Sequence, residues 1–522
     1  MTSTAKNRSN YRIGQDNISI WGMDIHNPVF AISAGVITLF VMLSLFFPDT
    51  SFQWLSDVKA WCLSTFDSFI MGSVSLIFLF CCVLLVSPAG KIKFGGEDAK
   101  PEFSMKSWLA MLFAAGMGIG LLFWGTAEPI AYFSGWGGTP LNTTPFSEEA
   151  AALAVPTSVY HWGIQAWAIY GLVGVSLAHV TFNGGLPLSI RSAFYPLLGE
   201  RVWGWPGHLI DIIAVLSTIF GLVTSMGLGA IQANSGLHLL FDIPNNYFSQ
   251  VIIIIAVTAV AIFSVIRGLD GGVKLLSNIN MILAFCLLLF VLLAGPTLEL
   301  LKATGTNTFQ YLVNLPQLSN WMNRPDESWM QGWSVFYWAW WVSWSPFVGV
   351  FIARISKGRT IRELLLAVLI VPTLVTILWM TTFGHSAVLL AQNGIGELAK
   401  GITDPTLTTF QLLAELPFPQ ISSFITVVLI LVFFVTSADS GALVVDSITA
   451  GGKMTSPARQ RIFWASTIGV IAIVLLVIGG NSVLNALQSG TVATGIPFTV
   501  VLLLMAVALI KSLFLNPSIN QK

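Results

Sequence analysis

The chain has 522 residues, of which 55% are apolar and only 9% are charged, whereas soluble domains average about 25% charged residues. Its 24 basic residues balance its 24 acidic residues, which argues against binding to nucleic acid and against a purely surface-bound role on a membrane. Together with a mean hydropathy of +0.79, this composition predicts an all-α polytopic membrane protein.

The N-terminus is polar and lacks the short apolar core of a cleavable signal, so membrane insertion is expected to begin at the first true span. Windows of about 19 residues predict twelve spans. The spans lie near 29–47, 68–88, 107–133, 151–180, 209–240, 249–266, 275–295, 332–353, 364–388, 419–449, 463–479 and 491–510. With the N-terminus inside, all basic residues except Lys59, Lys302, Arg324 and Lys400 fall in cytoplasmic segments. The sequence therefore predicts that both termini are cytoplasmic.

These spans divide the chain into a tail, two peripheral spans, two five-span blocks and a second tail. The segment between the blocks is too polar to cross a membrane, and FQYLVNLPQLSNWM within it is typical of a helix on the outer membrane surface. The expected boundaries are 1–28 for the first tail, 29–100 for the peripheral spans, 101–300 for the first block, 301–331 for the surface helix region, 332–511 for the second block and 512–522 for the last tail. Because five is odd, the second block has the opposite orientation.

Each five-span block opens with a span that carries a predicted break. The first span reads FAAGMGIGLLFWGTAEP and holds Gly116, Gly118 and Gly120, which weaken a helix. The second span holds Ser345-Pro346 in the middle of an apolar run. Paired interrupted helices in two inverted halves point to the central site of a secondary transporter. The alternative for the glycines is a close helix crossing through small residues.

Six aromatic side chains lie near the middle of two spans. In HWGIQAWAIYG they are three or five residues apart, and two of those in FYWAWWVSW are four apart, so several share a helix face. With no charge among them, such rings select a cation that cannot donate hydrogen bonds, above all a quaternary ammonium. An interfacial belt or simple packing is the alternative. The six candidate residues are Trp162, Trp167, Tyr170, Trp340, Trp341 and Trp344.

Polar groups within other spans are candidates for ion coupling. Thr436 and Ser437 in LVFFVTSADSGALVVD offer the oxygen ligands that Na⁺ takes, although such hydroxyls also bond back to their own helix. Asp439 is either functional or pairs with a cytoplasmic-side cation. Glu128 is expected to be exposed or to cap a helix end, and His161 to be a satisfied residue in a helix interface. The sequence shows no metal-ligand spacing, nucleophile elbow or catalytic carboxylate pair, so we expect no enzymatic activity.

These motifs together resemble the betaine/choline/carnitine transporter (BCCT) family. The family's signature is similar to FYWAWWVSWSPFVGVFIARISKGRTIRE, and FAAGMGIGLLFWGTAEP, HWGIQAWAIY and FFVTSADSG match in order and distance, so the resemblance covers about residues 27 to 512. It implies two inverted five-helix repeats of the LeuT type preceded by two peripheral helices. It also implies alternating access and a homotrimer whose contacts include the surface helix.

The resemblance also implies roles for particular residues. The six candidate aromatic residues match the family's substrate positions. The sodium ligands of the Na⁺-coupled members match Ala114, Met117, Phe433, Thr436 and Ser437. A second, weaker sodium position matches Thr218 and Phe347, but Leu222 stands where Na⁺-coupled members can have a hydroxyl.

The residue at position 120 indicates whether the substrate carries its own carboxylate. Proton-coupled choline carriers of the family tend to have Asp here, so a Gly suggests that the bound molecule brings its own carboxylate, as glycine betaine does. That carboxylate could rest on backbone N–H groups of the segment from Gly116 through Gly118 to Gly120. We therefore expect a Na⁺-coupled importer of glycine betaine in a bacterial inner membrane, with no cofactor beyond the coupling ion. Proton-coupled uptake of choline, or uptake of carnitine or dimethylsulfoniopropionate, is the alternative.

Overall fold

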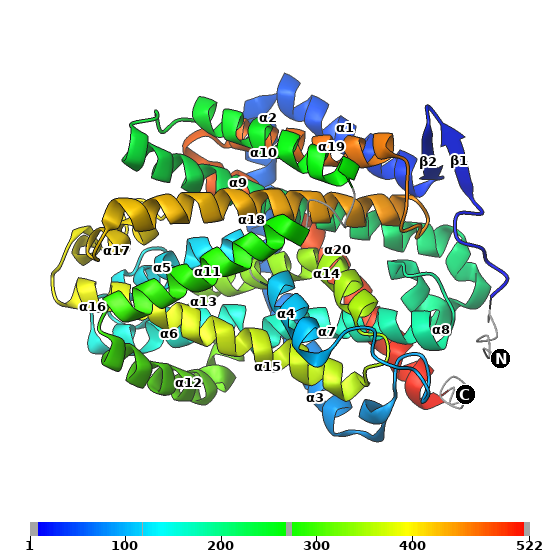
Figure 1. Ribbon diagram of the computed structural model, residues 1–522, viewed down its shortest axis with the longest axis horizontal. Coiled ribbons are helices and arrows are strands. Elements are labelled where there is room, and N and C mark those ends of the chain that lie inside the picture. Colours follow the sequence, from blue (N-terminus) through cyan, green and yellow to red (C-terminus); the bar gives the residue numbers. More distant parts are fainter. Residues whose placement is uncertain (1–8, 117, 268–273, 516–522) are drawn as a thin grey trace.

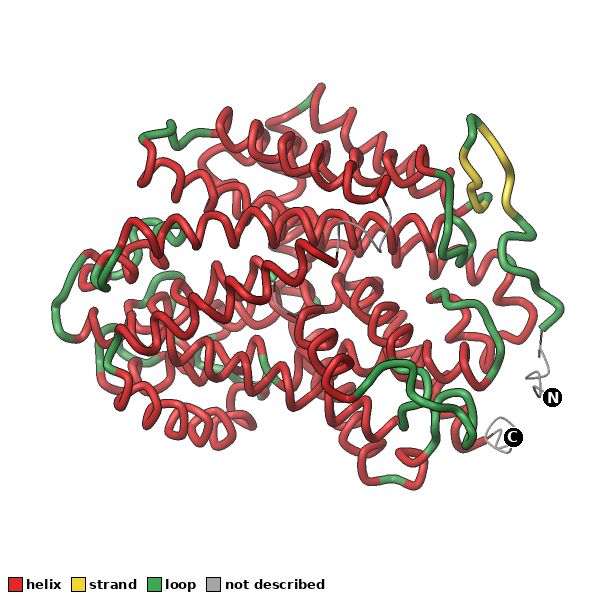
Figure 2. Tube along the Cα trace, in the orientation of Figure 1, coloured by secondary structure: helices red, strands yellow, loops and turns green. Residues whose placement is uncertain are grey.

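The computed structural model describes residues 9–116, 118–267 and 274–515, and helices dominate it (Figure 1). The first half contains α1 (Val29–Phe46), α2 (Pro48–Thr65), α3 (Asp67–Val86), α4 (Met105–Gly116), α5 (Ile119–Ser134), α6 (Glu148–Trp162), α7 (Ile164–Ala178), α8 (Tyr195–Leu198), α9 (Trp205–Phe241) and α10 (Tyr247–Arg267). The second half contains α11 (Lys274–Ala294), α12 (Thr297–Ser319), α13 (Glu327–Met330), α14 (Phe336–Ile355), α15 (Ile361–Trp379), α16 (Ser386–Gln392), α17 (Thr408–Ala414), α18 (Pro419–Thr449), α19 (Ala458–Gly479) and α20 (Val483–Ile510). The strands β1 (Asn17–Ile20) and β2 (Met23–His26) form a small hairpin beside the helices (Figure 2).

Ten helical segments of the described chain are long and apolar enough to cross a membrane. α11 and α12, bent by 110° against each other, add an eleventh if the pair counts as one span. The span predicted near 107–133 is divided between α4, with 12 residues, and α5, with 16 residues. Each is shorter than the roughly 20 residues that a bilayer requires. An all-α polytopic architecture is confirmed, whereas the count of twelve spans and the division into two five-helix repeats stay predictions.

The bundle is organised around its longest helices. α9, with 37 residues, packs along α18, and α14 packs along α7. The second contact is close because both helices present glycine there. A Cβ on Gly349 would lie 2.2 Å from Val173 Cγ1, and one on Gly174 would lie 2.7 Å from Ile352 Cγ2. This close crossing brings the aromatic side chains of α7 and α14 together.

The two predicted helix breaks have different outcomes. α4 ends at Gly116 and α5 begins three residues later, with Gly118 extended (φ −149°, ψ 178°), so the break in span three is confirmed. α14 runs through Pro346 without interruption, so the predicted break in span eight is wrong. The proline leaves the carbonyl of Val342 without its helical N–H partner. Ser345 Oγ donates to that carbonyl at 2.7 Å and so replaces the missing hydrogen bond.

A break that the sequence analysis missed lies between α6 and α7. Gly163 departs there from helical geometry (φ −101°, ψ −144°). Tyr311 of α12 supports the break, because its hydroxyl accepts a hydrogen bond from Ile164 N at 3.2 Å. A Cβ on Gly163 would lie 3.0 Å from the same oxygen. The helix predicted within 301–331 therefore exists, starts a few residues earlier, and buttresses the interior as well as exposing apolar side chains.

The described part of the N-terminal tail is folded against the helix ends. Asp24 in the hairpin forms an ion pair with Lys453 in the loop between α18 and α19. Arg191, which lies between α7 and α9, donates a hydrogen bond to the Nε2 atom of the fully buried His26 at 3.0 Å. Residues 9–26 thereby connect two loops that are far apart in the sequence.

Acidification is expected to loosen this hairpin. Burial, together with the positive charge of Arg191 and the neighbouring His208, lowers the pKa of His26 from 6.5 to about 3. The undocked segment therefore binds a proton below pH 6.5 that the docked segment does not bind. Docking should be fully stable above pH 6.5 and should lose about 1.4 kcal/mol per pH unit below it. Hydrogen exchange of the amides in residues 17–26, corrected for intrinsic rates, should be about tenfold faster at pH 5.5 than at pH 7.5.

A His26→Asn variant is the control for this measurement. Its side-chain oxygen can still accept a hydrogen bond from Arg191, but it does not titrate. The variant should show a much smaller difference between the two pH values, because the neighbouring His208 is the histidine that still titrates there. Equal protection of the wild-type hairpin at pH 5.5 and pH 7.5 would show that His26 does not govern its docking.

Candidate functional site

Five of the six predicted aromatic residues form one buried group, called the aromatic cluster below. The ring of Trp341 on α14 lies 5.5 Å from Trp162, 6.0 Å from Trp167 and 5.0 Å from Tyr170, measured between centroids. Trp340 lies 5.9 Å from Trp162, and Trp167 lies 5.5 Å from Tyr170. The interplanar angles range from 52° to 90°, which is the tilted or edge-on geometry that aromatic pairs prefer. The cluster therefore joins the end of α6 and the start of α7 to α14.

Trp344 stands apart from the aromatic cluster. Its ring packs edge-on against Phe347 at 5.6 Å, and its Nε1 donates to the carbonyl of Gly221 on α9 at 2.8 Å. Trp340 Nε1 donates to the same carbonyl at 3.3 Å. The two indoles thus anchor α14 to α9. Of the two, only Trp340 also contacts a ring of the cluster in the described structure.

The glycine-rich segment lies against the aromatic cluster. A Cβ on Gly120 would lie 2.5 Å from Trp162 Cη2 and 3.1 Å from Trp340 Cη2, so the cluster leaves no space for a side chain there. A Cβ on Gly118 would meet no atom within 4 Å, so open space adjoins the start of α5. The N-terminus of a helix offers unpaired N–H groups and a positive dipole end, which suit an anion. Gly116 is the last residue of α4.

Glu128 holds the cluster's Trp162 in place. It is fully buried, so the expectation of an exposed or capping carboxylate is wrong. Its Oε2 accepts hydrogen bonds from Trp162 Nε1 at 2.8 Å and from the Tyr337 hydroxyl at 2.6 Å. Its Oε1 contacts the Tyr132 hydroxyl and His161 Nδ1, each at 2.8 Å. These donors come from α5, α6 and α14, and they satisfy the carboxylate without exposing it to water.

His161 is a satisfied interface residue, as the sequence analysis expected. Its Nε2 lies 2.9 Å from Ser334 Oγ, and its ring stacks on Tyr337 with centroids 4.6 Å apart. The network around Glu128 was missed because its members come from separate helices. A usable signal existed, because a lone carboxylate in an apolar run must find several donors when it is buried.

Two indole N–H groups of the cluster have no hydrogen-bond partner within the described chain. They belong to Trp167 and Trp341, and both atoms are buried. An unpaired buried donor costs free energy unless a ligand or water satisfies it. The cluster can therefore offer donors as well as ring faces.

The described residues of the first predicted sodium position lie on α4 and α18. Met117 lies outside the described residues, and Ala114 is in the last turns of α4. Thr436 Oγ1 donates to the carbonyls of Val432 and Phe433 at 3.0 and 3.1 Å, which leaves its lone pairs available. Ser437 follows it on the same helix.

Asp439 does not make the ion pair that was one of the two expectations from the sequence. It accepts hydrogen bonds from Ser264 on α10 at 2.8 Å and from Ser440 at 3.0 Å. Within the described chain it forms no ion pair, so pairing with a cytoplasmic-side cation is not observed. Its observed role is to tie α10 to α18.

The second predicted sodium position is only partly polar. Thr218 on α9 is buried, and its Oγ1 has no partner within the described chain. Phe347 is on α14, next to the Trp344 ring. Leu222, one turn after Thr218, packs so closely on α18 that a Cβ on Gly441 would lie 2.3 Å from Leu222 Cδ1. Leu222 therefore serves packing and supplies no ligand.

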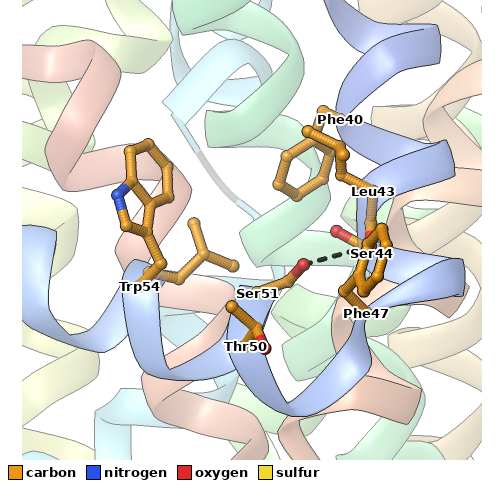
Figure 3. Close-up of a pocket in the computed structure, with 8 residues that line it drawn as sticks. Phe40, Leu43, Ser44, Phe47, Thr50, Ser51 and Trp54 are labelled. Carbon is orange, nitrogen blue, oxygen red and sulfur yellow. Dashed lines mark hydrogen bonds between the residues drawn. The ribbon is translucent and has the colours of Figure 1, made fainter.

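A cavity of about 280 Å³ lies elsewhere, between α1 and α2 (Figure 3). Apolar side chains line most of it, including Phe40, Leu43 and Trp54, and Ser51 Oγ donates to the Leu43 carbonyl at 3.2 Å. None of its lining residues was predicted to bind substrate or sodium. The cavity lies at the bend between α1 and α2, and none of its lining residues is charged. We therefore do not assign the substrate to it.

The chain was compared with known proteins. The model of the BCCT, betaine/carnitine/choline family transporters, matches residues 28–517. A glycine betaine/proline/choline/ectoine transporter of Vibrio parahaemolyticus is 55% identical over 97% of this chain and 90% of that protein. Glycine betaine transporter 1 of the same organism is 54% identical over 96% of each chain.

Solved structures show more distant similarity. MhsT in complex with L-phenylalanine has a TM-score of 0.45 and 14% identity, and covers 80% of this chain and 98% of that one. The manganese transporter of Eremococcus coleocola has a TM-score of 0.45 and 15% identity, and covers 78% and 82%. The family match spans nearly the whole chain. The chain belongs to the betaine/carnitine/choline family and is a transporter, not an enzyme.

Proposed function

We propose that this transporter imports glycine betaine, or a closely related zwitterionic quaternary ammonium, by symport with Na⁺. The observation that carries this proposal is the aromatic cluster, in which five rings gather around the junction of α6, α7 and α14. The Glu128 carboxylate lies behind the cluster, bonded to the indole N–H of Trp162. Ring faces attract an onium head that cannot donate hydrogen bonds, with about 2 kcal/mol or more from a good desolvated contact. The relatives from Vibrio parahaemolyticus are named for such substrates.

The carboxylate of a zwitterion finds donors beside the rings. The start of α5 lies against the cluster at Gly120, and open space adjoins Gly118. The unpartnered N–H groups of Trp167 and Trp341 are further donors. A substrate with its own carboxylate satisfies these groups, whereas choline brings only a hydroxyl. This difference favours glycine betaine over choline as the substrate. Proton-coupled choline uptake is therefore the second candidate function.

Sodium would bridge the break between α4 and α5 to α18. Ala114 and Met117 on one side, with Phe433, Thr436 and Ser437 on the other, are the proposed ligands, and Thr218 with Phe347 is a weaker second position. By joining the broken helix to α18, the ion would favour the conformation that binds substrate. One Na⁺ moving down 100 mV contributes about 2.3 kcal/mol, which is nearly two decades of substrate accumulation. The same proposal places a homotrimer in a bacterial inner membrane with both termini in the cytoplasm.

Proteoliposomes should accumulate labelled glycine betaine only when an inward Na⁺ gradient is imposed. Uptake should fall to the background rate when K⁺ replaces Na⁺ or when only a proton gradient is present. The measurement compares initial rates for betaine and for choline under each gradient. Proton-driven choline uptake without Na⁺-dependent betaine uptake would replace the first candidate with the second.

Two variants on α18 localise the ion. Thr436→Val removes a proposed sodium ligand, and the Na⁺ concentration for half-maximal uptake should rise about tenfold, the effect of one lost charge-assisted contact. Thr426→Val removes a buried hydroxyl that bonds to Ser422 O at 2.8 Å in the same helix, and should leave the Na⁺ dependence unchanged. A Thr436→Val variant with wild-type Na⁺ dependence would remove this residue from the sodium site.

A further inference from the structure

Glu128 is a buried charge that the transport scheme above does not use. Four groups lie within 2.8 Å of its oxygens: Trp162 Nε1, the Tyr337 hydroxyl, the Tyr132 hydroxyl and His161 Nδ1. An ionised carboxylate has about four lone-pair sites and can accept from all of them, whereas a protonated one would have to donate to a neighbour. An indole N–H can only donate. The geometry therefore gives a carboxylate ion one donor for each of its four contacts, and the Tyr132 hydroxyl and His161 Nδ1, which share Oε1, also lie 3.0 Å from each other.

The surroundings leave this negative charge without a full counter-charge. His161 satisfies both of its contacts in the neutral form, with Nδ1–H donating to Glu128 and Nε2 accepting from the Ser334 hydroxyl. The nearby Arg324 is already paired with Asp326 at 2.6 Å. Within the described chain, His161 is the only basic side chain within ion-pair distance of Glu128. The network can thus hold one net negative charge behind the aromatic cluster.

Trp162 is the residue of the aromatic cluster that is hydrogen-bonded to Glu128. Trp162 donates its N–H to Glu128 at 2.8 Å and presents its ring to Trp340 and Trp341. A hydrogen bond to an anion pushes electron density into the indole, which makes its faces more attractive to a cation. A buried carboxylate also attracts the cation directly, because screening is weak in a water-poor interior.

We propose that Glu128, acting through the Trp162 indole, sets how well the site accepts cationic onium compounds relative to zwitterionic ones. A net cation such as choline gains the full attraction of this charge. A zwitterion gains attraction at its ammonium group and repulsion at its carboxylate, and the two partly cancel. This inference rests on the proposed function, because it assumes that onium compounds bind at the aromatic cluster. It makes Glu128 a positioning and specificity-determining residue.

The test compares choline and glycine betaine binding to the purified full-length transporter. Dissociation constants are measured by intrinsic tryptophan fluorescence in detergent, with Na⁺ present, for the wild type and for Glu128→Gln. We expect the dissociation constant for choline to rise about tenfold or more and that for betaine to rise less than threefold. An equal change for both ligands, or a larger loss of betaine, would overturn the inference and leave the proposed function standing. A wild type that binds neither ligand would overturn both.

Two further variants separate charge from packing. Tyr132→Phe removes one hydroxyl from Oε1 of Glu128 but keeps the carboxylate and the Trp162 contact, so the ratio of choline to betaine affinity should not fall. Tyr337→Phe removes the hydroxyl that shares Oε2 with Trp162, which leaves more negative charge for the indole. This variant should improve choline binding relative to betaine by about twofold. It keeps the inference testable if Glu128→Gln does not fold, and a shift toward betaine would overturn the inference.

Discussion

Replacing Gly120 with alanine is expected to reduce glycine betaine uptake at least tenfold. The added Cβ would lie 2.5 Å from Trp162 Cη2, which is closer than carbon atoms can approach, and 3.1 Å from Trp340 Cη2, which is a tight contact. Trp162 cannot easily move away, because its Nε1 is bonded to Glu128. Overpacking of this kind costs about 1 to 3 kcal/mol, and here the strain falls on the rings proposed to hold the substrate. The measurement is the initial rate of labelled betaine uptake into proteoliposomes at a fixed Na⁺ gradient.

Gly35→Ala is the control for this variant. Gly35 lies on α1, which supplies none of the cluster's rings, and a Cβ there would meet no atom within 4 Å. Uptake by this variant should stay within about threefold of the wild type. If the two variants lose uptake equally, the loss in Gly120→Ala would not come from the lack of space beside Trp162.

Hydropathy and residue spacing predicted the architecture because they are local properties of the chain. An apolar run of sufficient length becomes a helix in a membrane whatever its neighbours are. The spacing of Trp167 and Tyr170 places both on one face of α7, and their rings are in contact as that spacing requires. The glycine run weakens a helix by its own backbone entropy, so the break before α5 could also be predicted.

Two of the three errors concern places where a distant partner decides the outcome. Pro346 does not break α14, because the adjacent Ser345 hydroxyl bonds to the freed carbonyl. Gly163 does break the helix after α6, and the hydroxyl that supports the break comes from Tyr311, far along the sequence. Glu128 looks like a helix-end carboxylate until its donors on other helices are seen. The outcomes at Gly163 and Glu128 depend on tertiary contacts that a single sequence does not display, whereas the Ser345 hydrogen bond is local.

The structure also assigns two different roles to the three tryptophans of α14 that the sequence analysis predicted to bind substrate. Trp340 and Trp344 both donate to Gly221 O, and this pairing fixes α14 against α9. Trp341 points instead to the rings of α6 and α7. Because neighbouring positions on a helix face different directions, one short motif can anchor the helix and line a site.

Trp341→Leu is expected to weaken glycine betaine binding about thirtyfold. Trp341 is the ring shared by most contacts of the aromatic cluster, since it lies within 6.0 Å of Trp162, Trp167 and Tyr170. Its removal deletes one cation–π face and loosens the three rings that it contacts, and about 2 kcal/mol corresponds to a thirtyfold change in dissociation constant. The measurement is betaine binding to the purified transporter, with the Michaelis constant for uptake as a second readout.

Two other tryptophans show whether this loss is specific. Trp464→Leu removes an equally buried indole from α19, where it donates to Thr449 Oγ1 at 2.8 Å, so it should lower thermal stability without changing betaine affinity. Trp344→Leu removes an anchor of α14, and its effect on affinity should be smaller than that of Trp341→Leu. A loss at Trp344 as large as that at Trp341 would mean that Trp344 also contacts the substrate, as the family resemblance implied. A wild-type affinity in Trp341→Leu would place the onium group outside the cluster altogether.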